Sequence, residues 1–179
     1  MARFVRLAFA ALLLSLAACQ SLRENQARWH RAHDVPPGAV AILERAVEFP
    51  TERANVYIQD GQVRPYGGVD LYSPHCELII RGDISHARTV SPDTFEIYRS
   101  VQEINPIYGM QTSGSATFPG AGESRAMFQT TMYLRSKSQP HVYQLVCGQW
   151  VYGSSDDYLT VAQIRAVLGN LIVLNLQGS

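Results

Sequence analysis

Hydrophobic and polar residues alternate with a period of two through most of the chain after residue 38, in short runs separated by glycine, proline, aspartate and serine. Such alternation is typical of β-strands that bury one face. It predicts strands at residues 39–43, 47–49, 54–59, 76–81, 94–99, 126–135 and 141–151. Asp60-Gly61 is a turn pair after the third strand, and residues 136–140 form a hairpin-sized connection between the last two.

The alternation also predicts which side chains share a strand face. In the strand at 126–135, one face carries Phe128, Thr130, Met132 and Leu134, and the other carries Gln129, Thr131, Tyr133 and Arg135. The other predicted apolar faces are Val56 with Ile58; Cys76 with Leu78 and Ile80; Phe95 with Ile97; and Tyr143 with Leu145 and Cys147. These faces should meet in one hydrophobic core.

Near the C-terminus the hydrophobic period changes to that of a helix, with apolar residues at Val161, Ile164, Val167 and Leu168. Thr160 and Gln163 have the spacing of a capping box, and Gly169 can supply the residue that ends the helix. The apolar residues 171–174 then predict a last buried strand.

Seven or so short strands and one short C-terminal helix predict a mainly β fold. Two architectures fit this pattern, an antiparallel sandwich and an α+β layer. We expect a single β-rich domain over residues 38–179, preceded by a polar segment at 19–37. The chain shows no internal repeat.

The N-terminus has a different character, with Arg3 and Arg6 followed by an apolar stretch at residues 7–14. About twelve apolar residues would rise only ~18 Å as a helix, against the ~30 Å hydrocarbon core of a membrane. A basic start followed by a short apolar region is typical of an export signal, which we place at residues 1–18. It ends in Leu16-Ala17-Ala18-Cys19.

This tetrapeptide resembles the lipobox of bacterial lipoproteins. The resemblance implies that Cys19 becomes the first residue of the mature protein, carries a diacylglyceryl group on its thiol and is acylated on its amino group. Two or three acyl chains hold a protein on a membrane where a single chain would exchange. Gln20, in place of aspartate, implies passage to the outer membrane under the enteric sorting rule. The alternative is a conventional signal peptide with an incidental cysteine.

The segment at 19–37 is polar and ends in the break Pro36-Pro37-Gly38, which is typical of a tether. His30 and His33 would share a helix face, and Asp34 could add an oxygen ligand to a metal. Because a short segment beside an anchor rarely holds a rigid coordination shell, we favour a solvated linker.

Charge limits the classes of partner. The chain has 15 basic and 15 acidic residues, and removal of Arg3 and Arg6 with the signal leaves 13 basic and 15 acidic. This balance gives no basic field for nucleic acid. It also makes attraction to polyanions or anionic headgroups an implausible driving force. We predict no cofactor.

Two cysteines remain besides Cys19, namely Cys76 and Cys147. An exported protein meets an oxidising compartment, so we expect a disulfide between them, buried between two strands. A thiol nucleophile, or a metal site with His75, His86 or His141, would need a reduced cysteine. Their spacing also matches no paired CxxC zinc pattern, so we predict no metal.

Motifs for catalysis are weak. A weak match to a nucleophile elbow occurs at Gly122-Glu123-Ser124-Arg125-Ala126, where alanine replaces the second glycine of the motif. This segment leads from the long loop 108–124 into a strand, whereas an elbow leads into a helix. Asp156 and Asp157 are adjacent, but no DxDxDG calcium loop surrounds them, so a solvated turn is favoured. We therefore predict no catalytic residue.

The nine tyrosines are more suggestive. Several of them, if they share one sheet face with Trp150, could form an exposed platform for sugar or peptide: Tyr57, Tyr66, Tyr72, Tyr98 and Tyr133. The competing interpretation, which we favour, is cross-strand packing.

These features support one leading hypothesis and two alternatives. The leading hypothesis is a non-catalytic envelope lipoprotein, tethered to the outer membrane, that binds another envelope protein or stabilises a complex. The first alternative is a module that binds a glycan, a peptidoglycan fragment or a lipid. The second is an enzyme whose catalytic residues converge only in space.

Overall fold

A computed structural model describes residues 24, 26–28, 32–107, 125–152 and 158–176. The chain divides into two compact units, Met1–Asp34 and Val35–Ser179. Residues 24, 26–28, 32 and 33 of the first unit are helical. In the described part of the chain, no helix has the length and hydropathy needed to span a membrane.

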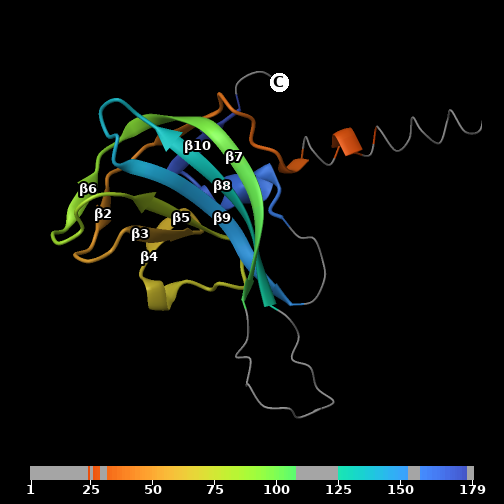
Figure 1. Cartoon of the computed structure of the whole chain (residues 1–179), viewed down its shortest axis with the longest axis horizontal. Coiled ribbons are helices and arrows are strands. Elements are labelled where there is room, and N and C mark those ends of the chain that lie inside the picture. Colours follow the sequence, from red (N-terminus) through yellow and green to blue (C-terminus); the bar gives the residue numbers. More distant parts are fainter. Residues whose placement is uncertain (1–23, 25, 29–31, 108–124, 153–157, 177–179) are drawn as a thin grey trace, which may run out of the picture. The chain divides into compact units, whose positions relative to one another are not determined.

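The second unit is mainly β, as predicted. Its strands are β1 (Val40–Leu43), β2 (Val47–Phe49), β3 (Asn55–Gln59), β4 (Gln62–Arg64), β5 (His75–Ile80), β6 (Arg88–Val90), β7 (Asp93–Ile107), β8 (Arg125–Arg135), β9 (Val142–Tyr152) and β10 (Ile172–Asn175). Eight of them form one antiparallel sheet in the order β10-β1-β7-β8-β9-β5-β3-β4, and β2 pairs with β6 (Figure 1).

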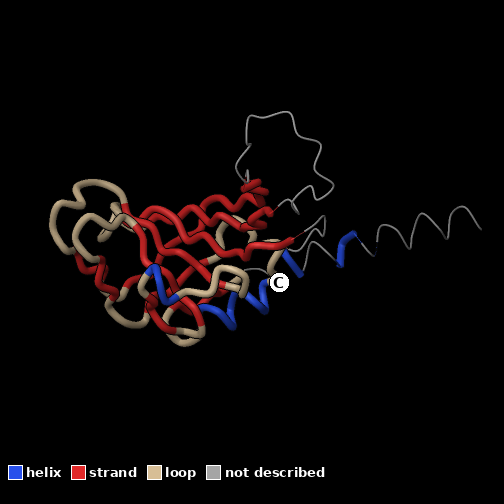
Figure 2. Tube along the Cα trace, turned by 90° about the horizontal axis from the view of Figure 1, so that it is seen from below, coloured by secondary structure: helices blue, strands red, loops and turns tan. Residues whose placement is uncertain are grey.

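The sheet curls around the C-terminal helix α2 (Val161–Leu168). The helix packs against β10 at one edge of the sheet and against β3 and β5 toward the other edge, so the two edges lie on either side of it (Figures 1 and 2). Its four predicted apolar residues are all buried. Of the two architectures that the sequence left open, the structure has the α+β layer.

The inner face of the sheet, which faces α2, carries the core. Cys76, Leu78 and Ile80 of β5 are at most 2% exposed, and so are Leu145 and Cys147 of β9. The predicted inner face of β8 is also buried. The period-two pattern therefore identified the core side of these strands, because each buried residue alternates with one on the outer face.

The capping box at the start of α2 is present as predicted. The backbone N–H of Gln163 donates to the hydroxyl of Thr160 at 3.2 Å, and the backbone N–H of Thr160 donates to the side-chain oxygen of Gln163 at 2.8 Å. Two backbone donors that have no partner within the helix are thereby satisfied.

We expect Thr160→Ala to lower the free energy of unfolding by about 1 kcal/mol, because the Gln163 N–H loses its acceptor. Thr160→Ser keeps a hydroxyl at the same position and should change stability little. Chemical denaturation of both variants measures the difference. Equal, negligible effects of the two substitutions would show that the cap contributes nothing.

The far end of α2 meets the β3–β4 hairpin. Asp60 and Gly61 both have positive φ angles, 55° and 69°, as a two-residue hairpin turn requires. The N–H of Gly61 donates to the carbonyl of Val167 at 2.8 Å, and a Cβ on Gly169 would lie only 2.8 Å from the Cα of Gly61. The close approach of these two glycines joins the hairpin to the end of the helix.

The structure adds elements that the sequence pattern did not predict. The strands β4 and β6 have three residues each with a single apolar residue among them, so they show no alternation. The strand β7 continues to Ile107, well past the predicted end at Arg99. It does so because β8 pairs with it from Glu96 to Ile107. Polar residues such as Gln102 and Glu103 hide this extension in the sequence.

Candidate binding surface

Three tyrosines from three neighbouring strands lie together on the outer face of the sheet. Tyr133 lies on β8, between Tyr98 of β7 and Tyr143 of β9. The ring centroids of Tyr98 and Tyr133 are 6.1 Å apart, and those of Tyr133 and Tyr143 are 5.7 Å apart. We call these three residues the tyrosine ladder.

Two β-bulges build the ladder. The β7–β8 pairing passes from Ile97 opposite Leu134 directly to Arg99 opposite Tyr133, which leaves Tyr98 as an extra residue. The β5–β9 pairing passes from Ile79 opposite Gln144 to Ile80 opposite Val142, which leaves out Tyr143. A bulge turns the extra side chain out of the regular alternation. Each strand beside Tyr133 thus presents a tyrosine next to it.

The bulge in β9 shows that one prediction from the sequence was wrong. The sequence pattern placed Tyr143 on the same face as Leu145 and Cys147. In the structure those two residues are fully buried, whereas Tyr143 is half-buried and contacts Tyr133 on the outer face. The prediction was wrong because a period of two assumes a regular strand. In β9 the bulge makes Tyr143 an extra residue, so it does not follow the alternation of Leu145 and Cys147.

An arginine accompanies each tyrosine of the ladder. The guanidinium carbon lies 5.0 Å from the ring centroid for Arg81 over Tyr143, 5.1 Å for Arg99 over Tyr133 and 5.6 Å for Arg135 over Tyr98. These distances are within the range of cation–π attraction. The ladder and these arginines together form what we call the tyrosine–arginine face.

One of the arginines is also part of an ion pair. Arg135 donates to Glu96 at 2.7 Å, and this hydrogen bond raises the pKa of Arg135. Tyr98 is 42% exposed, and Arg81, Arg99 and Arg135 are all exposed, so solvent reaches the face. Exposed tyrosine and arginine side chains of this kind are typical of surfaces that bind a partner.

The face contains a small pocket between its outer two tyrosines. Its volume is about 210 Å³, and its lining residues are Arg81, Tyr98, Leu134, Arg135, Ser136, Pro140 and Tyr143. Two of these, Ser136 and Pro140, belong to the connection between β8 and β9. The shape of the pocket therefore depends on how that connection is held.

Asp93, the first residue of β7, holds the β8–β9 connection in place. Its carboxylate accepts hydrogen bonds from the hydroxyls of Ser136 and Ser138, both at 2.6 Å, and from the amide of Gln139 at 3.2 Å. Partial burial alone would raise the pKa of Asp93, but these hydrogen bonds outweigh it and lower the pKa to about 2. The ionised form of Asp93 therefore stabilises the folded connection.

We expect Asp93→Asn to lower the free energy of unfolding at pH 7 by about 1 kcal/mol, a value reduced for the solvent access of this site. A depressed pKa in the folded state gives stability that is present above the ordinary value of 3.8 and is lost as the pH falls toward about 2. The difference between the two proteins should therefore shrink across that window. Denaturation curves at pH 7 and pH 2.5, run beside an exposed Glu44→Gln control, test this; a pH-independent difference would contradict it.

The other aromatic residues of the predicted platform form two pairs apart from the ladder. Tyr57 and Tyr66 have ring centroids 5.7 Å apart, and Tyr72 meets Trp150 edge-on at 5.8 Å. The six aromatic residues of the predicted platform therefore pack in three separate groups, although the strand pairing places Tyr57, Tyr133 and Trp150 on the outer face. Cross-strand packing and an exposed face both occur, and the sequence could not decide between them.

The pair Tyr57 and Tyr66 lines a groove of about 410 Å³, whose other residues are Glu48, Pro50, Thr51, Arg53, Asn55, Val56, Val63, Arg64 and Pro65. Arg53 lies over the ring of Tyr66 at 5.8 Å. Burial and the neighbouring Glu77 raise the pKa of Tyr57, whose ring is half-buried at the base of this pair.

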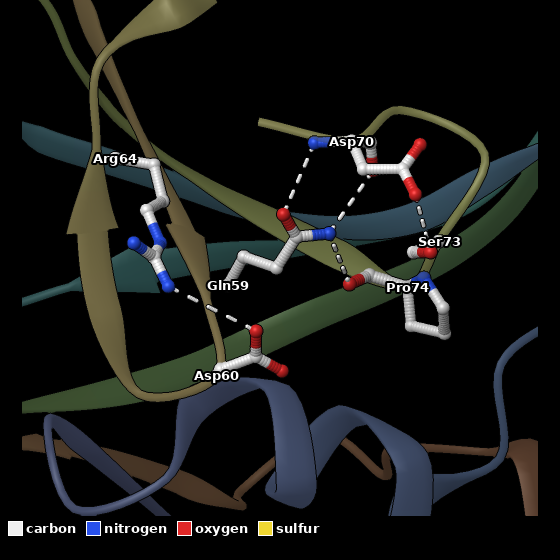
Figure 3. A network of polar contacts seen from close by, with 6 residues as sticks. All are labelled: Gln59, Asp60, Arg64, Asp70, Ser73 and Pro74. Carbon is white, nitrogen blue, oxygen red and sulfur yellow. Dashed lines mark hydrogen bonds and ion pairs between the residues drawn. The ribbon is translucent and has the colours of Figure 1, made fainter. Parts of the chain in front are cut away.

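A polar network lies at the turn end of the same hairpin, around Gln59 (Figure 3). The amide of Gln59 donates to the carbonyls of Asp70 and Pro74 and accepts from the N–H of Asp70, and the hydroxyl of Ser73 donates to the Asp70 carboxylate at 2.7 Å. The Ser73 hydrogen bond, with that from the Tyr72 N–H, lowers the pKa of Asp70. These polar groups are hydrogen-bond partners of one another, so the network fixes the loop that leads into β5.

Cys76 and Cys147 lie opposite each other on β5 and β9, with their sulfur atoms 2.08 Å apart and their Cα atoms 4.0 Å apart. The expected pairing is thus present at disulfide distance. Both residues are fully buried on the inner face.

The histidines considered as metal ligands do not converge. His75, at the start of β5, is fully buried and its Nδ1 lies 3.0 Å from the carbonyl of Ser73. His141 precedes β9, at the other end of the β5–β9 pair, and its pKa is lowered by burial and by Arg88. His86 contacts Ser85 in an exposed bend. Across the described residues, no group of three His, Cys, Asp or Glu side chains could hold a metal ion.

Several residues singled out in the sequence lie outside the described part of the chain: Cys19, Gln20, His30, Ser124, Asp156 and Asp157. The sequence analysis also missed residues that the structure brings to the face, namely Arg81, Arg99, Arg135 and Tyr143. Tyr98-Arg99 and Tyr133-Leu134-Arg135 do show a tyrosine near an arginine in sequence. That signal marks four residues of the face but not their partners, because Arg99 lies over Tyr133 and Arg135 lies over Tyr98. The bulges that align them leave no mark in the sequence.

Comparison with known proteins gives no relative for this chain. No protein-family model, no curated protein and no solved structure matches it.

Proposed function

We propose that this protein is a non-catalytic binding module of the bacterial envelope, tethered by a lipid on Cys19, and that its tyrosine–arginine face docks on another envelope protein. The anchor is supported by the resemblance of Leu16-Ala17-Ala18-Cys19 to a lipobox. The single observation that carries the docking role is the ladder, in which two bulges align three tyrosines, each with an arginine.

The chemistry of the face favours a protein partner. Tyrosine and arginine are over-represented among the residues that dominate the energy of protein–protein interfaces, because they combine large contact area with hydrogen bonding. A sugar ring would stack on a flat tyrosine face. In the ladder, however, an arginine lies over a face of every ring, and Tyr133 and Tyr143 meet edge-on at 82°.

A second candidate function, binding of a glycan or peptidoglycan fragment, is favoured by the groove beside Tyr57 and Tyr66. Its volume of about 410 Å³ falls in the range of small-molecule sites, and Tyr66 is 61% exposed. Asn55 and Glu48 add polar groups to a mainly apolar wall.

In-cell photocrosslinking separates the two candidates. A photoreactive residue at Lys137, an exposed position in the connection beside the pocket, should give one dominant protein adduct, and Tyr133→Ala should remove it. The same photoreactive residue at Tyr66, in the groove, serves as the matched position. An adduct or a retained glycan at Tyr66 with none at Lys137 would favour the second candidate and contradict the first.

We expect Cys19→Ala to release the protein from membranes, because the acyl chains are its proposed anchor. Fractionation of cells, followed by a high-salt wash of the membranes, measures the change. Ser21→Ala is a suitable control, since it changes a residue close to the lipobox but outside it. If the Cys19→Ala protein stayed with the washed membranes as the wild type does, the lipidation proposal would fail.

A further inference from the structure

The pocket in the tyrosine–arginine face brings two cations to one small volume. Arg81 and Arg135 both line it, and the rings of Tyr98 and Tyr143 form its walls. Leu134 and Pro140 add apolar surface. We propose that this pocket receives one carboxylate from the protein partner, on an aspartate or glutamate side chain or at a chain terminus. This inference rests on the proposed function and specifies the chemistry of the partner.

The charges of the tyrosine–arginine face favour an acidic group on the partner. Among the described residues, no carboxylate forms an ion pair with Arg81, whereas Arg135 is paired with Glu96. Arg99 and Lys137 add positive charge nearby. The ionised Asp93, whose hydrogen bonds come from neutral side chains of the β8–β9 connection, adds one negative charge, so the cations still outnumber the carboxylates. The face is thus locally basic, although the mature chain as a whole has more acidic than basic residues.

The size and walls of the pocket favour a single side chain. Its volume of about 210 Å³ is below the range of roughly 300–1,000 Å³ that is usual for sites of whole small molecules. The planar guanidinium group of an arginine can donate two parallel hydrogen bonds to one carboxylate. Tyrosine rings beside the pocket exclude part of the water, which strengthens attraction between opposite charges.

A membrane surface is a poorer match for the face than a protein. Arginines also bind phosphate, so a lipid headgroup could supply the anion. A face that rests on a membrane would present exposed apolar side chains for insertion. Of the large hydrophobic residues found exposed in the described ranges, Tyr98 is the member that belongs to this face; the others are Val63, Tyr66, Tyr72, Ile104 and Val173.

The first test uses the full-length protein in cells, with the photoreactive residue at Lys137. Arg81→Gln should lower the yield of the protein adduct about tenfold, because the carboxylate loses a charge-assisted hydrogen bond. Arg99→Gln removes the same charge from the face but does not line the pocket, so a smaller loss, about twofold, is expected. Arg45→Gln, at an exposed arginine outside the face, should leave the yield unchanged.

Equal losses with Arg81→Gln and Arg99→Gln would overturn the pocket and leave only a general effect of charge. The absence of any adduct at Lys137 would instead count against the proposed function. A second test does not depend on the partner: purified full-length protein in detergent is titrated with N-acetylglutamate, with its diamide or with inorganic phosphate, and the tyrosine ring signals are followed by NMR.

N-acetylglutamate should shift the signals of Tyr98 and Tyr143 in the wild type and leave them unshifted in the Arg81→Gln protein. The diamide of N-acetylglutamate, which has the same shape but no carboxylate, should shift them at least fivefold less at equal concentration. Stronger effects from phosphate than from N-acetylglutamate would overturn the carboxylate assignment in favour of a phosphate-bearing partner such as a lipid headgroup. Equal effects of the acid and the amide would overturn it as well.

Discussion

Replacement of Cys76 and Cys147 together by alanine is expected to lower the free energy of unfolding by about 4 kcal/mol. The two cysteines are 71 residues apart in sequence, and a crosslink over that distance restricts the unfolded chain strongly in the chain-entropy model. Both side chains are fully buried between β5 and β9, so their removal also takes packing from the centre of the sheet. Chemical denaturation under oxidising conditions measures the loss.

Reduction of the wild-type protein provides the control. A reductant should destabilise the wild type by a similar amount and leave the double variant unaffected, because the variant has no bond at this place to reduce. Non-reducing peptide mapping of protein purified without reductant should recover the two cysteines in one crosslinked peptide. Recovery of both as free thiols, or a wild type that is indifferent to reductant, would contradict the disulfide.

The inner face of the sheet could be predicted from the sequence because the side chains of a strand alternate between two faces. Where one face is buried, apolar residues recur with the same period of two. Val56 and Ile58, for example, alternate with the more polar residues of β3, and a residue that faces the core is usually apolar whatever strand lies beside it. The cap of α2 could be predicted for a similar reason. Thr160 and Gln163 satisfy each other's backbone donors within a single turn, so no distant part of the chain is needed.

The order of the strands could not be predicted in this way, because it depends on contacts between distant segments. The strand β1 lies between β7 and β10, which begin far along the chain, and nothing in residues 40–43 specifies either neighbour. The choice between a sandwich and an α+β layer has the same origin. It depends on whether the inner face meets a second sheet or the helix, and both would bury the same side chains.

The candidate site was harder to predict than the core, because it depends on register. Tyr98 and Tyr143 reach the ladder only through bulges, and a bulge is a property of two paired strands together. A sequence pattern treats each strand alone. It therefore gave Tyr143 the wrong face, and it could count the tyrosines without showing which of them would meet.

The proposed docking face and the core are coupled through the pairing of β8 and β9. Tyr133 and Tyr143 lie near one end of that pair, and Cys147 lies further along β9 on the inner face. A change that separates β8 from β9 should therefore disturb both the ladder and the core. The residue best placed to show this is a glycine in the middle of β9.

Gly148→Ala is expected to lower the free energy of unfolding by about 3 kcal/mol, a cost typical of forcing an extra group into a packed interior. Gly148 pairs with Gln129 on one side and His75 on the other. A Cβ at this position would lie inside van der Waals distance of the carbonyl oxygen of Phe128 and 3.0 Å from the Cα of Gln129. Both are backbone atoms of β8, so no side-chain rotation can relieve the clash, and the two strands must move apart.

Gly67→Ala is the matched control for this substitution. A Cβ on Gly67 would meet nothing within 4 Å, so the control adds the same methyl group in open space and should change stability by less than about 0.5 kcal/mol. Thermal and chemical denaturation of both variants measure stability, and the adduct formed by a photoreactive residue at Lys137 reports on the docking face. Because β8 and β9 carry two of the three ladder tyrosines, Gly148→Ala should reduce that adduct together with stability. A Gly148→Ala protein as stable as the Gly67→Ala control would show that β8 and β9 are not as close at this point as the structure places them.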